Sequence, residues 1–298
     1  MKAQLKTLRR HIRRFLGSEA EIARLEKQQQ MLKEVISLLR YSVLDTERVK
    51  SSITYVRCSE IISLLTPMDV KDGNFIRVGR NNDGGYVMLD NFDNKSVSAA
   101  YSFGISNDVS WDEAMAARGV EVYMFDHTIT KLPKDNPKFH FFRKGVTGYL
   151  KSEHVETLSD LLIKNGHAES NDLILKMDVE ACEWDVFLQT PSSVIDQFAQ
   201  IVIELHELCP VRGDAHHRAV VDSLSKINLT HQSIHVHANI NCTPIWIGGK
   251  ILPDLMEITF IRRKDVEGRL VENTRMFPTA LDQPTYEGLP DLQLGYFR

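Results

Sequence analysis

From residue 97 onward, short apolar runs alternate with segments in which apolar residues recur at helical spacing. This pattern predicts strands at 97–104, 120–126, 139–146, 172–179 and 200–206. It predicts helices at 109–118, 155–165, 184–198 and 214–227. Two later strands, near 231–238 and 255–263, are joined by a link with Pro and Gly and no evident helix. Such alternation is typical of parallel strands with crossover helices on both faces. We therefore expect an α/β fold with a mostly parallel sheet and an antiparallel edge hairpin.

The chain before residue 97 changes character once. A helix is predicted at about 46–65, and it ends before Pro67. From Asn74 the residues form short β-rich runs, and Asp83-Gly84-Gly85 separates two of them. Because Asp followed by Gly is a strong turn signal, we expect a tight turn there.

Residues 22–43 show a short heptad seam. Its apolar members, with Gln29 at one further seam position, are Ile22, Leu25, Leu32, Ile36, Leu39 and Val43. Steps of three and four flanked by charges favour a coiled coil or a helix docked on another helix. The seam therefore predicts a homo-oligomer joined through this helix; a helix packed on its own domain is the alternative.

The first fifteen residues form a basic amphipathic stretch. Its cations, which surround four apolar residues, are Lys2, Lys6, Arg9, Arg10, Arg13 and Arg14. One interpretation is contact with an anionic membrane surface or an acidic partner. The other is a basic face that is only solvated.

Charge also separates this region from the rest of the chain. The 298 residues have a net charge of -4. Residues 1–50 hold twelve Lys and Arg and six Asp and Glu, which leaves 24 and 34 in the remainder, a net charge of -10. An acidic body argues against general nucleic-acid binding, which needs a basic face.

We divide the chain into an N-terminal helical segment at 1–66, an α/β domain at 67–265 and an irregular tail at 266–298.

The four cysteines are scattered along the sequence, which fits a reducing compartment. No apolar run approaches the roughly 18–20 residues that span a bilayer. We expect a cytoplasmic protein, held at the inner face of the membrane if the basic stretch binds lipid.

In open α/β sheets, ligands bind beyond the carboxyl ends of the strands. One predicted strand ends in Phe103-Gly104, where Gly104 permits a turn close to a ligand, and Ser106 or Asn107 can cap the next helix. Asp126 follows this turn by about twenty residues, the spacing at which an acid meets a ribose diol. Its two oxygens match the two hydroxyls. Capping of the following turn is the alternative role for Asp126.

Two further strand ends carry titratable residues. Asp178 and Glu180 face the same side if their strand continues, and paired carboxylates need solvent, a partner or a cation. An acid cluster at a helix start is the alternative. Glu204 and His206 share a face of the next strand, and His206 is a candidate base because its unperturbed pKa lies near 6.5.

A divalent cation is the alternative to a base acting alone. Its candidate ligands are Asp178, Glu180 or Glu204, and His206, and it would bind two sugar hydroxyls and make one of them more acidic. We favour the metal-free base. The late strand ends in further groups that can orient a hydroxyl or bind a metal, namely His235, His237, Asn239 and Asn241.

The quoted residues belong to five motifs, in chain order Asp83-Gly84-Gly85-Tyr86-Val87, Tyr101 through Trp111, Phe125-Asp126-His127, Leu175 through Trp184, and Ile203-Glu204-Leu205-His206. Taken together, over about residues 75–263, they resemble the FkbM-like S-adenosylmethionine-dependent methyltransferases. Within these, they are similar to a methyltransferase-like subgroup with a DGGY element.

The resemblance implies a Rossmann-like seven-stranded methyltransferase sheet, S-adenosylmethionine as methyl donor, and a small-molecule or glycan acceptor. The methylated group would be a hydroxyl of a sugar, polysaccharide or related metabolite. The residues assigned to the cofactor are Phe103, Gly104, Ser106, Asn107, Asp126 and His127. Those assigned to catalysis are Asp178, Glu180 and His206, and those assigned to the acceptor are Asp83, Tyr86, His237 and Asn239.

Two positions depart from the family pattern. The turn after Phe103 lacks the repeated glycines of the general methyltransferase signature, and Ala181 stands where the family commonly has glycine.

The sequence leaves two other functions open. One is a methyltransferase fold without chemistry that acts as a scaffold through its N-terminal helix; the retained Asp126 and Asp178 argue against it. The other is an NAD-dependent oxidoreductase, disfavoured by the single-glycine turn and the late antiparallel pair.

Overall fold

The computed structural model describes residues 24–33, 46–92, 96–149 and 151–298. Internal contacts divide the chain into two compact units, residues 1–55 with 246–250, and residues 56–245 with 251–298. In the first unit, residues 24–33 are helical and exposed. The basic stretch at 1–15 and most of the heptad seam lie outside the described residues, so the coiled coil and the membrane contact stay predictions.

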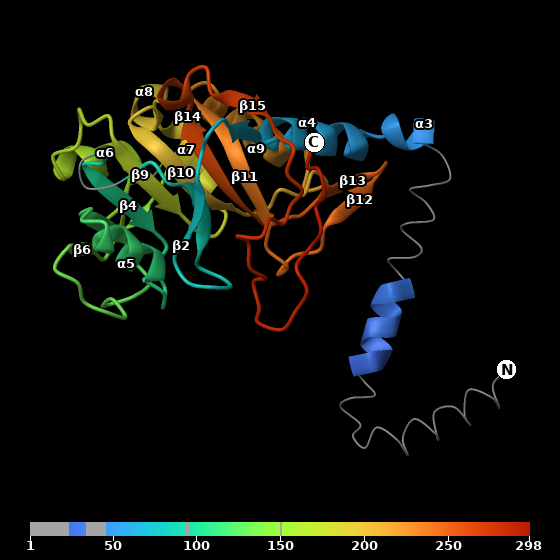
Figure 1. The fold of residues 1–298 in the computed structure, drawn as a ribbon, viewed down its shortest axis with the longest axis horizontal. Coiled ribbons are helices and arrows are strands. Elements are labelled where there is room, and N and C mark those ends of the chain that lie inside the picture. Colours follow the sequence, from blue (N-terminus) through green and yellow to red (C-terminus); the bar gives the residue numbers. More distant parts are fainter. Residues whose placement is uncertain (1–23, 34–45, 93–95, 150) are drawn as a thin grey trace, which may run out of the picture. The chain divides into compact units, whose positions relative to one another are not determined.

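The second unit contains a seven-stranded sheet, which confirms the predicted fold class (Figure 1). Its strands, in spatial order, are β11 (His231–Ala238), β14 (Met256–Arg262), β10 (Phe198–Leu205), β9 (Leu173–Met177), β4 (Ala99–Phe103), β5 (Val122–Phe125) and β6 (Phe139–Phe142). The five from β10 to β6 are parallel, and β14 is antiparallel to both β10 and β11. The predicted antiparallel pair is therefore present, with β14 inserted between β10 and the edge strand β11.

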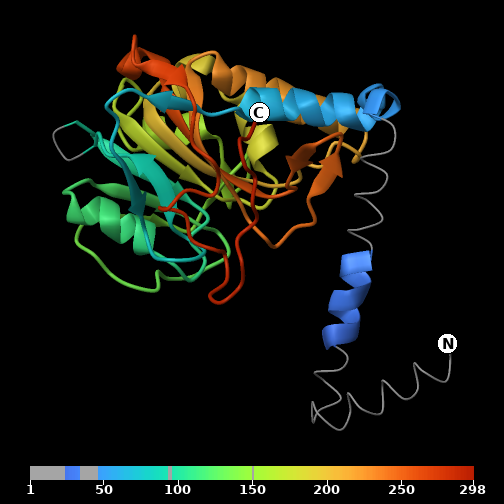
Figure 2. The same cartoon turned by 45° about the vertical axis from the view of Figure 1, so that its right-hand side comes forward.

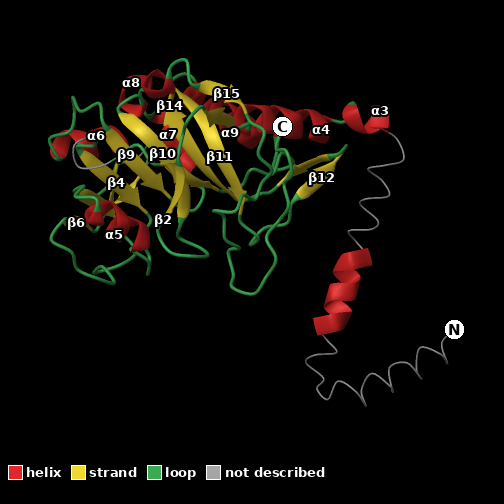
Figure 3. Ribbon diagram, in the orientation of Figure 1, coloured by secondary structure: helices red, strands yellow, loops and turns green. Residues whose placement is uncertain are grey.

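Helices flank this sheet (Figure 3). Their bounds are α4 (Ile53–Leu65), α5 (Ser110–Ala117), α6 (Leu158–Lys164), α7 (Glu183–Gln189), α8 (Ser192–Ile195) and α9 (Asp214–Asn228). In Figure 2, α4 runs alongside α9, and the side-chain amide of Asn228 donates to the carbonyl of Leu64 at 2.8 Å. The hydroxyl of Ser223 on α9 donates to the carbonyl of Trp184 on α7, which joins these two helices.

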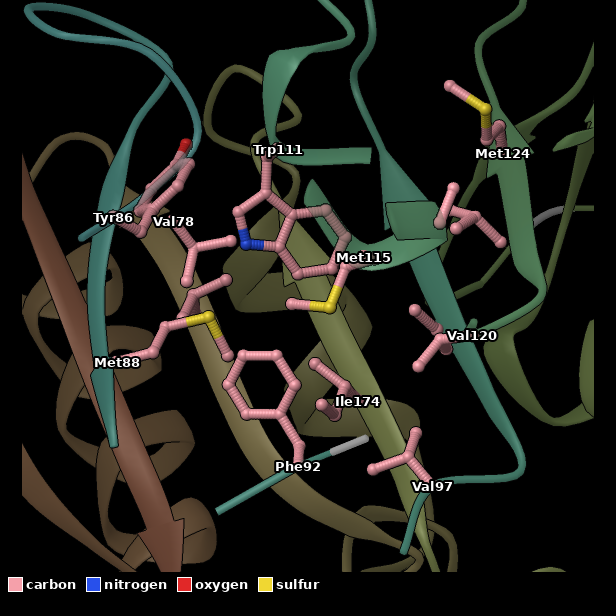
Figure 4. Packing of buried hydrophobic residues seen from close by; sticks show 14 of the residues in the cluster. Val78, Tyr86, Met88, Phe92, Val97, Trp111, Met115, Val120, Met124 and Ile174 are labelled. Atoms are coloured by element: carbon pink, nitrogen blue, oxygen red, sulfur yellow. The ribbon is translucent and has the colours of Figure 1, made fainter. Parts of the chain in front are cut away.

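The opposite face is covered by α5 and by the hairpin of β2 (Phe75–Val78) and β3 (Tyr86–Leu89). Figure 4 shows Trp111 and Met115 of α5 packed with Val78 and Met88 of the hairpin over Ile174 of β9. All five side chains are at most 2% exposed. Burial of this apolar surface, worth roughly 25 cal/mol per Å², fixes α5 and the hairpin against the sheet.

Several predicted elements are shorter in the structure than the sequence pattern indicates. The helix at 46–65 is broken into α3 (Thr46–Lys50) and α4, because Ser52 accepts a hydrogen bond from the amide of Tyr55 and starts a new helix. The strand at 139–146 stops at Phe142, and β7 (Gly145–Val146) pairs instead with β8 (Val155–Glu156). The predicted helix at 184–198 is divided into α7 and α8 before Pro191, which cannot continue a helix interior.

The late link and the tail contain more structure than expected. The link holds β12 (Ile245–Ile247) and β13 (Lys250–Leu252), which pair with one another. After β14 the chain forms a 3₁₀ turn, η1 (Arg263–Val266), and the tail holds β15 (Leu270–Glu272), which pairs with β1 (Met68–Val70). Among the described residues, no helix has both the length and the apolar character needed to cross a bilayer.

Candidate active site

The parallel strands end in register. Phe103 pairs with Phe125 on β5 and with Met177 on β9, and Met177 pairs in turn with Ile203 on β10. The residues that follow these four positions form one row across the sheet edge, namely Gly104, Asp126, Asp178 and Glu204. The predicted functional residues are therefore adjacent because of strand register, although they are up to 100 positions apart in the sequence.

Gly104 permits the closest approach in this row. Its φ is +76°, and a Cβ built on it would lie 1.7 Å from the carbonyl oxygen of Asp178. Any other residue would clash with backbone here, so the turn after β4 requires glycine. The turn continues through Ser106, whose φ of +48° is also in the left-handed region.

Asp126 holds this turn in place. Its Oδ2 accepts hydrogen bonds from the amides of Ile105 at 3.0 Å and Ser106 at 2.9 Å. Its Oδ1 accepts from the amide of Thr128 at 2.7 Å and from the Thr128 hydroxyl at 2.6 Å. Burial raises the pKa of Asp126, but these hydrogen bonds from Thr128, Ser106 and Ile105 outweigh it, so its pKa lies below the usual range.

The predicted cap of α5 is wrong. The N-cap is Val109, and neither Ser106 nor Asn107 makes a side-chain cap. Instead Asp108 accepts hydrogen bonds from the amide and hydroxyl of Ser110. The left-handed φ of Ser106 directs the chain away from the helix start, which leaves Ser106 and Asn107 exposed at the mouth of the site.

Three polar residues that the sequence reasoning missed lie behind the turn. Lys176 of β9 is 6% exposed, and its Nζ donates to the carbonyl of Gly104 at 2.6 Å. Trp111 and Asp112 are both 1% exposed, and Trp111 Nε1 and Asp112 Oδ1 have no hydrogen-bond partner among the described residues. Burial raises the pKa of Asp112 to about 6. The signal was a single lysine inside the apolar run Leu173–Met177, since a buried cation needs a partner.

After β9 the chain does not stay extended. Asp178 is partly buried, but Glu180 and Ala181 have φ values of +52° and +73°, so the strand ends and Glu180 is exposed. The expectation that Asp178 and Glu180 share a face of a continued strand is therefore wrong. The left-handed φ of Ala181 is a conformation that glycine adopts without strain and that other residues adopt at a cost.

His206 lies at the centre of four carboxylates. Its Nδ1 is 3.0 Å from Glu183 Oε1. Its Nε2 is 3.3 Å from Glu204 Oε1, 3.5 Å from Glu180 Oε2 and 3.9 Å from Asp178 Oδ1. Glu180 thus reaches the same imidazole as Asp178, although by a different path of the backbone.

The electrostatics of this group follow from its charges. Burial lowers the pKa of His206, but its hydrogen bonds with Glu183 and Glu204 outweigh burial and raise it to about 11. Burial and the charge of Glu204 raise the pKa of Asp178 to about 7. Burial also raises the pKa of Glu204. The four carboxylates around His206 therefore hold more negative charge than its one imidazolium balances.

One cavity of about 640 Å³ joins the turn to this carboxylate group. Its lining includes every residue that the sequence assigned to cofactor, acceptor, catalysis or metal, with the exceptions of His235 and His237. Asp83 and Tyr86 reach it from the β2–β3 turn, and Asn239 from the end of β11. Lys176, Trp111 and Asp112 line it as well.

His237 has a different role. Its Nδ1 is 2.9 Å from Glu257 Oε2 and its Nε2 is 2.8 Å from Asp291 Oδ2. His235, two residues earlier on the same strand, is 2.8 Å from Asp282. These two buried contacts fasten residues 279–291, which we call the C-terminal strap, against β11. The strap also reaches the cavity wall, since the hydroxyl of Thr285 donates to Asn239 Oδ1 at 3.2 Å.

The comparison with protein families agrees with this geometry. The profile of a family described as a methyltransferase domain matches residues 68–245, more than half of the chain. The chain belongs to this methyltransferase-domain family. A search of curated proteins found no match.

The cavity of this methyltransferase domain fits S-adenosylmethionine, the methyl donor that the family implies. At Gly104 the turn lies so close to the carbonyl of Asp178 that no Cβ fits, and both residues line the cavity. The indole N–H of Trp111 and Oδ1 of Asp112 are buried, line the cavity and lack partners among the described residues. A bound ligand can supply the hydrogen bonds that these buried polar atoms lack.

Proposed function

We propose that the chain transfers a methyl group from S-adenosylmethionine to a hydroxyl of a sugar, polysaccharide or related metabolite, in agreement with its FkbM-like resemblance. The observation that supports this best is the continuous cavity that connects the turn at Gly104 with the carboxylates around His206. One end offers backbone and buried polar atoms, and the other offers hydrogen-bond acceptors. A cofactor and an acceptor can thus meet inside one cleft.

At the cofactor end of the cavity, the residues of this chain position and orient S-adenosylmethionine. When bound, S-adenosylmethionine supplies an electrophilic methyl group on a sulfonium. Asp126 fixes the amides of Ile105 and Ser106, and Lys176 fixes the carbonyl of Gly104, so the turn is rigid before a ligand arrives. A preformed turn lowers the entropy lost on binding.

At the acceptor end, the chain offers groups that accept hydrogen bonds. Asp178, Glu180 and Glu204 are carboxylates, and ionised carboxylates only accept. A hydroxyl can donate to them, and in O-methylation its proton must leave. Because the raised pKa keeps the imidazole of His206 protonated near neutral pH, we assign acceptance of that proton to the carboxylates of Asp178 and Glu180, which His206 contacts. Such a base contributes roughly 10²- to 10⁴-fold to the rate. Alignment of the acceptor oxygen supplies the rest of the catalysis by this chain.

Two measurements test the proposal. S-adenosylmethionine is titrated calorimetrically into the purified chain, with NAD titrated in parallel. Cofactor carrying a labelled methyl group is then offered with a panel of glycans and small hydroxyl compounds, and products are read by mass spectrometry. We expect binding of S-adenosylmethionine and label on an acceptor oxygen.

The other outcomes would identify a different function. Binding of NAD without S-adenosylmethionine would establish the oxidoreductase. Binding of neither would overturn the methyltransferase proposal and favour the scaffold. Label on nitrogen would overturn O-methylation while retaining the methyltransferase.

A further inference from the structure

We propose that Asp178, Glu204 and His206 bind one divalent first-row transition cation at the acceptor end of the cavity. One ligand atom from each of the three residues lies within 4.8 Å of the other two. The three come from the ends of two adjacent strands, β9 and β10, which hold them in place. The meaning of this cation for catalysis rests on the proposed function; its binding does not.

The histidine is oriented as a ligand. Its Nδ1 contacts Glu183 Oε1 at 3.0 Å, so Nδ1 keeps its proton, and a cation that displaces the proton of Nε2 meets the lone pair of that nitrogen. That lone pair is on the side of Glu204 and Asp178. A carboxylate behind a histidine is the usual support for a metal-binding imidazole. Glu183 is fully buried and is itself held by the amide of Val179 at 3.0 Å.

A buried atom without a partner supports the same conclusion. Glu183 Oε2 is buried and has no hydrogen-bond partner among the described residues. A fully buried carboxylate with one unsatisfied oxygen is costly unless positive charge lies close by. Glu183 shares the neighbouring imidazole of His206 with Glu204 and Asp178. A dication bound at Nε2 supplies the missing charge.

Glu204 adds an independent argument from the sheet. It lies directly opposite Glu257 in the β10–β14 register, and both side chains belong to residues only 6% exposed. Like charges at directly opposed positions destabilise a sheet. Glu257 has His237 as a partner, and Asn239 donates to Glu204 Oε2 at 3.2 Å. The other oxygen of Glu204, Oε1, is therefore the one that faces His206 and the cation.

The ligand set indicates the kind of cation. Two carboxylates and one imidazole combine hard oxygen with a borderline nitrogen, which suits Mn²⁺ or Zn²⁺ better than Ca²⁺ or Mg²⁺, which prefer oxygen alone. Three protein ligands leave positions for water and for oxygens of an acceptor. The neighbouring group of Asp83, Glu204 and Glu257 contains carboxylates only, and we assign no ion to it.

The test measures metal binding without turnover. The full chain is treated with a chelator, exchanged into metal-free buffer and titrated with Mn²⁺ while the electron paramagnetic resonance signal of free Mn²⁺ is followed; Zn²⁺ competition is measured afterwards. We expect one Mn²⁺ bound per chain and its displacement by Zn²⁺. Absence of stoichiometric binding of either ion would overturn the proposal and leave the carboxylates free for a cationic group of the acceptor.

Variants locate the ion. Glu204→Gln and His206→Gln should each lose more than the roughly 10- to 100-fold in affinity that is typical of supporting residues, and Glu183→Gln should lose about that amount. Glu121→Gln is the matched control, because Glu121 also contacts a histidine, His140 at 2.9 Å, outside the cavity. Unchanged Mn²⁺ affinity in Glu183→Gln together with either ligand variant would overturn the assignment.

The same samples separate this inference from the proposed function. If Glu204→Gln does not fold, as judged by circular dichroism, Asp178→Asn and Glu183→Gln carry the test. S-adenosylmethionine is titrated into the chelated wild type. Cofactor binding without metal binding overturns only the cation; failure to bind the cofactor overturns the methyltransferase proposal.

Discussion

A Cβ on Gly104 would lie 1.7 Å from the carbonyl oxygen of Asp178. The two residues end neighbouring parallel strands, and no side chain fits between them. The turn at Gly104 and the carboxylates around His206 are therefore joined through a backbone contact. A change at Gly104 displaces Asp178 as well.

We predict that Gly104→Ala destabilises the fold and weakens the binding of S-adenosylmethionine. The left-handed backbone alone costs an L-residue about 1–2 kcal/mol, and the clash adds to this. The control is Gly166→Ala, since Gly166 has a φ of +80° and nothing within 4 Å of an added Cβ. Urea unfolding and calorimetric titration should show the larger loss at Gly104. Equal losses in both variants would mean that the contact with Asp178 does not matter.

Ala181→Gly should stabilise the protein. Ala181 has a φ of +73°, and replacing an L-residue there by glycine removes about 1 kcal/mol of strain. The preceding Glu180, at φ +52°, keeps its side chain near His206 in this variant. Thermal unfolding measures the gain; a lower melting temperature would show that the turn is unstrained at this position.

Asp126→Asn should loosen the cofactor turn. An amide group retains one acceptor oxygen, so either the Ile105 and Ser106 amides or Thr128 lose their partner. We expect a loss of about 1.5–3 kcal/mol in unfolding free energy, typical of hydrogen bonds to charged groups, and weaker binding of S-adenosylmethionine.

The pH dependence of the Asp126 effect has a definite sign. Its pKa is lowered in the folded state, so its contribution is present above the unfolded value near 3.9 and is lost as pH falls through the folded value. The difference between wild type and Asp126→Asn should therefore be constant from pH 7 to 5 and shrink below about pH 4. A constant difference down to the lowest accessible pH would contradict the assignment.

His206→Gln should lower kcat strongly while leaving the binding of S-adenosylmethionine nearly unchanged. The imidazole contacts four carboxylates at the acceptor end of the cavity and none at the Gly104 turn. These are Glu183, Glu204, Glu180 and Asp178. A loss of roughly 10²- to 10⁴-fold in kcat is expected, because Asp178 and Glu180, the carboxylates assigned to proton acceptance, lose the imidazole that they contact. Radiolabel transfer and calorimetry measure the two quantities. Full turnover would place proton acceptance elsewhere.

The C-terminal strap should loosen at high pH. Burial lowers the pKa of His237, but the charge of Glu257 and the hydrogen bond with Asp291 raise it to about 10, and Asp282 adds to this. Because the folded pKa exceeds the unfolded value near 6.5, this stabilisation is complete below pH 6.5 and is lost as pH rises through 10. Neighbouring His235, with a lowered pKa, does not supply the effect.

Asp291→Asn tests the strap. Loss of this charged hydrogen bond should cost about 1.5–3 kcal/mol near neutral pH and flatten the pH dependence of unfolding between pH 6.5 and 10. Urea unfolding across this range, with proteolysis of the strap as a local readout, measures both. A slope equal to that of wild type would show that another group titrates.

The apolar runs predicted the strands of the sheet closely, because a buried central strand can be recognised from its own residues. β9, β10 and β11 begin and end within about two residues of the predicted bounds. The pattern failed where a local feature ends an element. A hydrogen bond to Ser52 divides the predicted helix, and the left-handed φ of Glu180 ends the predicted strand. It also failed for Lys176, whose partner Gly104 is 72 positions away.

By itself, the sequence determined the α/β class, the four polar strand ends and the glycine turn, because hydrophobic periodicity and residue type are local properties. Only the tertiary structure decided which polar groups meet. Strand register set Gly104 against Asp178 and gathered four carboxylates around His206, and the inserted strand β14 placed Glu257 opposite Glu204. The strap took His237 out of the predicted acceptor group by pairing it with Asp291. Such pairings depend on distances across the fold, which no stretch of the chain encodes alone.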